Sequence, residues 1–251
     1  MDTKVDIRWV NETDSTQDEV RRHISECDNM SVIAARFQTA GRGQRGNTWL
    51  AREGENLTFS MLVRFGDNGF PPLAARLQFA VTKAATLGVV NYLAGRGIQC
   101  SIKWPNDIYV RDKKICGMLI ENTLAGHCLD YCVVGIGLNV NQLSFPVQIT
   151  NPTSMALLTG NKYDLPEELK ILSSLLADSF TKVLAVNLSS ADEEYGRLLY
   201  RKNVFHEYTR CADGTVFEGK IVGTTDEGLL LVEDNKGELN KFAFKEISYI
   251  I

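Results

Sequence analysis

The residues best suited to chemistry near the start of the chain lie in a loop from Gln38 to Trp49. Three glycines within six residues allow tight turns and a close approach of the backbone to a ligand. Arg42 and Arg45 lie between these glycines and carry fixed positive charge that can pair with a phosphate. The loop is therefore predicted to bind an anion; the alternative is a solvated hairpin loop with incidental arginines.

The loop glycines, Gly41, Gly43 and Gly46, also have the spacing of a dinucleotide-binding loop, which needs a strand before it and a helix after it. Residues 31–37 have a strand pattern, but so do residues 57–65 beyond the loop. Because no helix dipole is then available, arginine side chains must neutralise a bound phosphate directly.

A second group of reactive side chains begins at Lys103-Trp-Pro-Asn-Asp107. This segment places a lysine, an indole, an amide and a carboxylate at a break between apolar strands. Lys114 follows in a turn, three residues before Gly117. These residues are predicted to line a ligand site. The alternatives are a turn with a capping aspartate and a lysine that is simply solvated.

Two further segments contribute small and polar residues. Residues 135–141 end a predicted strand in glycines and amides that suit a flat ring or a ribose. Ser15 and Thr16 lie at the start of a predicted helix, where Thr16 and Glu19 have the spacing of a capping box. Capping and ligand contact are equally consistent with that position.

The elements that must position these residues are strands interspersed with helices. Strands are predicted over residues 4–10, 31–37, 57–65, 100–104, 107–110, 115–122 and 128–139. A long helix is predicted from Pro71 and Pro72 to about Leu93, and others from Pro166 and from about residue 191. Consecutive hairpin strands indicate an α+β fold, with helices on one face of a mixed or antiparallel sheet.

The pattern changes after Asn203. Short strands over residues 216–223, 228–233 and 239–244 are separated by glycine turns, which is typical of a small β-barrel. We therefore expect a main domain over residues 1–203 and a small barrel domain over 204–251. A unit of about 45 residues buries little core, so it is expected to dock on the main domain.

Composition excludes several classes of protein. A net charge of -4 gives no basic footprint for nucleic acid, and no apolar run approaches the roughly 20 residues of a membrane span. Without a signal-peptide pattern, the chain is expected to be cytoplasmic. The six cysteines and three histidines have no zinc spacing, so no metal site is predicted and the cysteines are expected to be reduced and mostly buried.

In combination, these motifs resemble those of the biotin protein ligases. Residues 41–46 correspond to that family's Gly-Arg-Gly-Arg-Arg-Gly loop, residues 103–107 to its Lys-Trp-Pro-Asn-Asp motif, residues 135–139 to its Gly-x-Gly-x-Asn segment, and residues 14–16 to its Asp-Ser-Thr. The resemblance covers most of the chain. It implies a class II synthetase-like catalytic domain followed by a small SH3-like β-barrel.

The resemblance implies an ATP-dependent reaction in two steps. Biotin is adenylated to biotinyl-5′-AMP with release of pyrophosphate, and the biotinyl group then passes to one lysine of a biotin carboxyl carrier protein. Mg²⁺ is expected to arrive with the ATP phosphates rather than in a protein cage. The carrier domain of a biotin-dependent carboxylase is thus the implied partner, and exposed sheet edges are compatible with a homodimer.

The resemblance also implies roles for single residues. Lys114, Arg42 and Asp107 are the implied catalytic residues: Lys114 bridges the biotin carboxylate and the α-phosphate, and Asp107 positions the attacking lysine. The residues implied in biotin binding are Ser15, Thr16, Gln38, Gly41, Arg42, Lys114 and Gly117. The residues implied in ATP or adenylate binding are Arg42, Arg45, Trp49, Lys103, Asn106 and Asn139. Met118 and Ile120 are expected to wall the biotin pocket.

Two residues depart from the family pattern. Gln44 stands in place of the second loop arginine, which predicts some release of biotinyl-AMP, and Cys116 stands in place of a small residue with no expected effect on packing. No helix-turn-helix module precedes Val5, so the repressor function of some family members is not expected. Two alternatives remain: a lipoate protein ligase, whose own loop differs and which lacks Lys-Trp-Pro-Asn-Asp, and a non-catalytic module that binds biotin.

Overall fold

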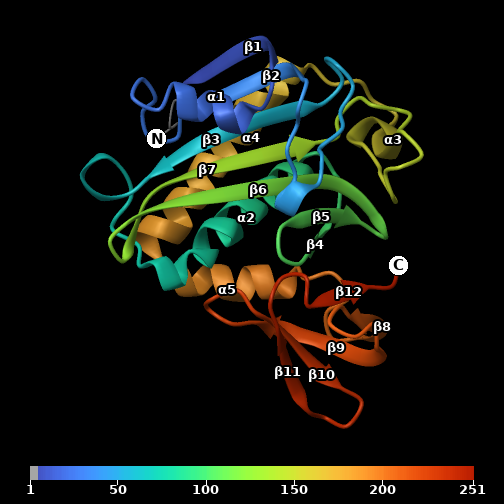
Figure 1. Ribbon diagram of the computed structural model, residues 1–251. Coiled ribbons are helices and arrows are strands. Elements are labelled where there is room, and N and C mark those ends of the chain that lie inside the picture. The colour runs from blue at the N-terminus through green and yellow to red at the C-terminus, as the bar shows by residue number, and fades with distance from the viewer. Residues whose placement is uncertain (1–4) are drawn as a thin grey trace.

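The computed structural model describes residues 5–251, apart from the side chains of Arg45 and Ser190. Two sheets organise these residues (Figure 1). The larger has seven strands in the order β1-β2-β3-β7-β6-β5-β4, and the smaller has five in the order β11-β10-β9-β8-β12. The predicted α+β class, with a mixed sheet, packed helices and a small C-terminal β unit, is confirmed.

The larger sheet is antiparallel except at one edge. Its strands are β1 (Ile7–Thr13), β2 (Val32–Gln38), β3 (Leu57–Arg64), β4 (Ser101–Lys103), β5 (Asp107–Val110), β6 (Lys113–Ala125) and β7 (Cys128–Leu138). Only β1 and β2 pair in parallel. The first strand runs three residues further than predicted, because the polar residues up to Thr13 still pair with β2 through backbone hydrogen bonds that need no apolar side chain.

Two long helices, α2 (Phe79–Gly95) and α4 (Leu165–Phe180), pack together behind the sheet, and α5 (Leu188–Arg197) lies between α2 and the small sheet (Figure 1). The short α3 (Met155–Thr159) follows β7. The predicted start of the long helix at Pro71 is wrong. Residues 73–75 instead hydrogen-bond to the turn and strand at 127–129, so the helix begins only at Phe79.

The helix α1 (Thr16–Arg22) packs on the opposite face of the sheet, where Val20 contacts Ile33, Leu62 and Val133. The expectation that helices cover one face is therefore wrong. Strand residues alternate between faces, and the central strands carry apolar residues on both. The helix is capped by Ser15, whose Oγ accepts from the Gln17 backbone N–H, and not by Thr16 as predicted.

The small sheet contains β8 (Phe205–Arg210), β9 (Val216–Thr224), β10 (Leu230–Asp234), β11 (Leu239–Phe242) and β12 (Ile247–Tyr249). The strands β8 and β12 were not predicted, because each places only one residue in the core and so lacks apolar alternation. The unit docks through the Trp104 indole, whose Nε1 donates to the Gly228 carbonyl at 2.9 Å. Gly228 has φ +93, and a Cβ there would meet the Phe79 ring at 2.6 Å, so only glycine suits this contact.

In the part of the chain that the structure describes, no helix is both long enough and apolar enough to cross a membrane. The six cysteines are unpaired: Cys116 and Cys132 are buried, three are partly buried, and Cys211 is exposed. The expectation of mostly buried thiols therefore holds fully for only two of them.

Candidate active site

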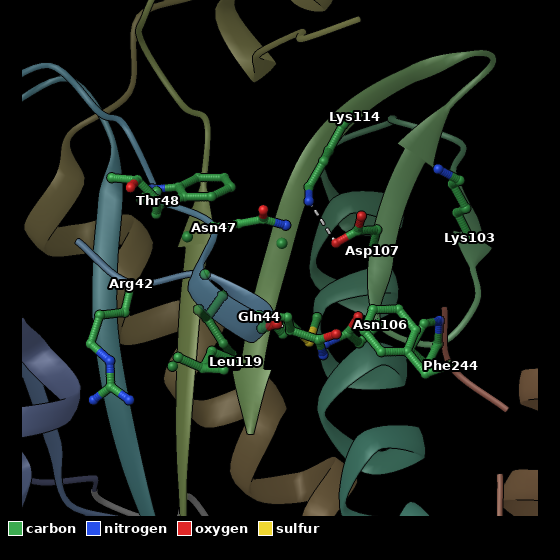
Figure 2. A pocket seen from close by; sticks show the side chains of 18 of the residues that line it. Arg42, Gln44, Asn47, Thr48, Lys103, Asn106, Asp107, Lys114, Leu119 and Phe244 are labelled. Carbon is green, nitrogen blue, oxygen red and sulfur yellow. Dashed lines mark hydrogen bonds and ion pairs between the residues drawn. The ribbon is translucent and has the colours of Figure 1, made fainter. Parts of the chain in front are cut away.

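A cavity of about 530 Å³ opens on the sheet face that carries α1. Its walls come from four places: the start of α1, the loop after β2, the turn between β4 and β5, and residues 244–249 of the small unit. The volume of this cavity and its mixture of polar and apolar lining residues are typical of a site for a small molecule. Figure 2 shows side chains of the loop after β2, of the segment around the turn between β4 and β5, and Phe244 of the small unit around this space.

Three glycines of β6 and β7 form the floor: Gly117, Gly135 and Gly137 share one face of the sheet. A Cβ on Gly137 would lie 2.6 Å from Trp49 Nε1, and one on Gly117 would lie 2.9 Å from Lys114 Nζ. The glycines therefore let the indole and the ammonium group lie directly across the strands.

The loop after β2 is a closed hairpin with a 3-10 turn at Gln44–Gly46. The Gly43 N–H donates to the Asn47 carbonyl at 2.7 Å, and the Trp49 N–H donates to the Gly41 carbonyl at 2.9 Å. A Cβ on Gly41 would lie 2.5 Å from the Trp49 carbonyl oxygen. The glycine here thus permits close approach to the loop's own backbone, and Gly41 does not line the cavity.

The cation and carboxylate of the second motif meet at the cavity. Lys114 Nζ lies 2.7 Å from Asp107 Oδ1 and 5.9 Å from the centre of the Trp49 ring (Figure 2). Asn106 anchors the turn beside them, since its Nδ2 donates to the Met118 carbonyl at 2.7 Å. Lys114 is therefore held by its ion pair with Asp107 and by the Trp49 ring. The two alternatives, a lysine bonded only to water and an aspartate that caps a turn, do not describe these contacts.

Lys103 contributes a second cation to the lining. Its Nζ lies 5.0 Å from the ring centres of both Tyr109 and Tyr249 and donates to Tyr109 Oη at 3.3 Å. Burial lowers the pKa of Lys103, and the negative charge of Asp107 opposes that shift. The site therefore holds this ammonium group between two aromatic rings, one from each sheet.

Polar groups gather at the start of α1. Ser15 and Thr16 are buried; the Thr16 N–H donates to Gln38 Oε1 at 2.8 Å, and Thr16 Oγ1 lies 2.8 Å from Ser60 Oγ. Sequence reasoning missed Gln17, whose Nε2 donates to the carbonyl groups of Leu119 and Val133. Its Oε1 is a buried acceptor that has no partner among the described residues. Its place directly after Ser15-Thr16 was the available signal.

Two further predicted site residues differ from expectation. Arg42 lines the cavity, but its guanidinium points away from Lys114 and pairs with Asp18 at 2.9 Å and Glu121 at 2.6 Å (Figure 2). Asn139 is buried outside the lining, where its Nδ2 donates to the Thr153 carbonyl at 2.9 Å. The side chain of Arg45 lies outside the described part of the chain.

The expectation that Met118 and Ile120 line the pocket is wrong for Ile120 only. Ile120 packs against the core and lies outside the lining, whereas Met118 is a core residue that also borders the cavity. Leu119, between them, belongs to the lining as well (Figure 2). The small unit contributes Phe244, Lys245 and Tyr249 to the lining, which sequence reasoning did not foresee.

The donor set suits a polyphosphate better than a bound metal. Asp107 is the one carboxylate among the described lining residues, and it is already paired with Lys114. Across residues 5–251, no group of three His, Cys, Asp or Glu side chains could hold a metal ion. A cation accompanying a nucleotide would therefore be held mainly by the phosphates themselves.

Comparisons with known proteins agree with this geometry. The model of the Biotin/lipoate A/B protein ligase family matches residues 9–139. The Bifunctional ligase/repressor BirA of Bacillus spizizenii is 30% identical over 215 residues, which cover 82% of this chain and 62% of that protein. The Biotin--[acetyl-CoA-carboxylase] ligase of Paracoccus denitrificans is 31% identical over 169 residues, covering 66% of this chain and 69% of that protein.

A solved structure resembles nearly the whole chain. The biotin protein ligase of Aquifex aeolicus in complex with biotin and ATP superposes with a TM-score of 0.77 at 26% identity, covering 97% of both chains. By contrast, this chain spans only 62% of the length of the Bacillus relatives that it matches.

Proposed function

The chain belongs to the biotin/lipoate A/B protein ligase family, and from that premise we propose that it is an ATP-dependent biotin protein ligase. In the first step, a biotin carboxylate oxygen attacks the α-phosphorus of ATP, which forms biotinyl-5′-AMP and releases pyrophosphate. In the second, the amine of an acceptor lysine attacks the biotinyl carbonyl, which forms an amide and releases AMP and a proton.

The ion pair of Lys114 with Asp107, held across Gly117 beside Trp49, is the observation that carries the proposal. The first step brings two anions together, which is costly in a site of low dielectric unless a fixed cation lies between them. In the proposed complex, the Lys114 ammonium turns from Asp107 to the carboxylate and the α-phosphate. Its positive charge then favours the transition state, because negative charge accumulates there between the two reacting groups.

The remaining lining residues divide between the two substrates. We assign the polar end formed by Ser15, Thr16 and Gln38 to the ureido ring of biotin, because Ser15 and Thr16 are buried, Gln38 is partly buried, and the three supply hydroxyl and amide partners. The indole of Trp49 is assigned to the adenine ring, which it can contact through its face. Lys103 and Asn106, which line the same cavity, are assigned to the nucleotide.

Mg²⁺ bound to the ATP phosphates would supply further neutralisation of the leaving pyrophosphate. The chain's own part in the second step falls to Asp107. Once Lys114 has moved to the adenylate, the freed carboxylate can orient the incoming amine and accept its proton.

We further propose that the chain divides into a catalytic unit over residues 1–203 and a small unit over 204–251 whose loop closes one wall of the site. The acceptor is proposed to be a biotin carboxyl carrier domain, and the compartment to be the cytoplasm, in line with six unpaired cysteines. A homodimer remains part of the proposal, with the exposed strand edges as the contact.

The test is biotin-dependent release of pyrophosphate from ATP, with mass spectrometry of a purified carrier domain. Lys114→Ala is expected to slow the release by about 10- to 150-fold, since a charge-assisted hydrogen bond contributes about 1.5 to 3 kcal/mol. Lys113→Ala is the matched control, because this neighbouring lysine is exposed and lies outside the cavity.

Three outcomes would contradict the proposal. Equal rates for the two lysine variants would remove Lys114 from the mechanism. Turnover with lipoate but not with biotin would indicate a lipoate ligase. Binding of biotin with no ATP consumption would make the chain a binding module.

A further inference from the structure

Four charged side chains from three separate segments meet beside the cavity. Arg21 and Asp18 belong to α1, Glu121 to β6, and Arg42 to the loop after β2. Each carboxylate contacts both arginines. The Asp18 carboxylate lies 3.1 Å from the Arg21 guanidinium and 2.9 Å from that of Arg42. The Glu121 carboxylate lies 2.8 Å from the Arg21 guanidinium and 2.6 Å from that of Arg42. The arrangement is a closed ring of alternating charge.

This ring connects the loop tip to α1 and β6. Within residues 42–48, the other hydrogen bonds of the described atoms join the loop to itself, such as Gly43 to Asn47 and Asn47 to Gln44. Among the described side chains of this loop tip, which exclude that of Arg45, the guanidinium of Arg42 is the group that hydrogen-bonds to other elements, and it reaches two of them. The same loop residues line the cavity that we assign to biotin and ATP.

We propose that Asp18, Arg21, Arg42 and Glu121 form a latch that holds the loop over the cavity and so retains the adenylate until the acceptor lysine arrives. Asp18 and Glu121 are positioning residues in this inference, because they act through Arg42. The identity of the retained compound, biotinyl-5′-AMP, rests on the proposed function. The closure of the loop by these four side chains does not depend on it.

The strength expected of the latch is set by its exposure. Its side chains are between 27% and 38% exposed, so water and salt weaken each pair. Removing one carboxylate is expected to increase adenylate release about two- to fivefold, and removing both about five- to thirtyfold. The latch is thus strong enough to retain an intermediate and weak enough to open for an acceptor.

The test compares Asp18→Asn/Glu121→Gln with a control of equal charge change, Glu26→Gln/Asp130→Asn. Glu26 and Asp130 are exposed and lie outside both the latch and the cavity. Release of biotinyl-5′-AMP is measured in single turnover, without an acceptor, at about 50 mM and about 500 mM NaCl. The latch variant is expected to release faster at low salt, whereas high salt accelerates release from the natural chain and the control toward the same rate. Asp18→Glu, which keeps the charge, is expected to remain close to the natural chain.

A second readout does not depend on catalysis. Trypsin cleavage after Arg42 or Arg45, followed by intact mass, reports loop opening, and thermal unfolding verifies that the variant remains folded. Faster cleavage in the latch variant alone supports the latch. Cleavage and release equal to those of the control would overturn it. If the natural chain makes no adenylate, the proposed function fails, and the cleavage rates alone decide about the latch.

Discussion

Replacing Trp104 with phenylalanine is predicted to loosen the small unit from the main one. The indole is 5% exposed, and its Nε1 donates to the Gly228 carbonyl of the turn before β10. Its ring also lies edge-on to Phe244, 6.1 Å between centres. Phenylalanine keeps an aromatic ring but removes the donor and leaves the carbonyl oxygen without this partner.

The size of the effect follows from these contacts. A buried acceptor left without its donor costs about 1 to 3 kcal/mol, and the smaller ring adds about 1 kcal/mol through lost packing. The free energy of unfolding is then expected to fall by about 2 to 4 kcal/mol. In a chain of this length, this corresponds to a decrease in Tm of roughly 4 to 16 °C.

The assay is differential scanning calorimetry, together with amide hydrogen exchange in residues 225–230. Tyr195→Phe is the comparison, because it removes a donor to the Pro105 carbonyl at 2.7 Å from α5 rather than from the small unit. Both variants should lower Tm, but only Trp104→Phe should accelerate exchange in the turn at Gly228. If Trp104→Phe leaves Tm within about 1 °C and exchange unchanged, the indole does not hold the small unit, and the reasoning is refuted.

Gly137→Ala should displace the Trp49 ring and raise the KM for ATP. Gly135→Ala should change the KM much less, because a Cβ there meets its nearest neighbour at 3.1 Å. Steady-state kinetics of the two variants test this difference. Burial raises the pKa of Tyr208 to about 12, so the folded state keeps a neutral phenol while the unfolded state ionises near pH 10. Stability should therefore fall between about pH 10 and 12, and Tyr208→Phe should reduce that fall in pH-dependent urea unfolding. Gln44→Arg should slow the escape of biotinyl-AMP in an acceptor-free reaction, and equal escape from both chains would reject the hypothesis drawn from this departure.

The pattern of apolar and polar residues predicted those helices and strands whose formation depends mainly on residues close together in the sequence. The strands at β3, β6 and β7 have long apolar runs, and α4 has a proline at its start, so each is specified by its own sequence. The start of α2 was wrong because pairing of residues 73–75 with residues 127–129 overrides a proline signal that would otherwise start a helix. The strand β8 escaped prediction because its pairing partners, and not its own pattern, make it a strand.

For the candidate site as well, some residues could be predicted from the sequence and the contacts of others could not. The types and spacing of Lys114, Asp107 and Asn106 indicate a site, the family resemblance adds Trp49, and the structure brings all four to one cavity. Arg42 was selected on the same grounds, but two carboxylates that lie 24 and 79 residues away bind its side chain. No local pattern reports such a partner.

By itself, the sequence determined which segments carry reactive side chains. Charged side chains, amides and glycines at a break between strands lower the stability of the fold unless a ligand or a turn requires them. Only the tertiary structure decided where those side chains point. One residue of register separates Leu119, on the face of the sheet that carries α1, from Met118, in the core on the other face, and a strand's register is fixed by its neighbours. The wall supplied by the small unit likewise depends on a hydrogen bond between residues 124 positions apart, which exists only once both sheets have folded.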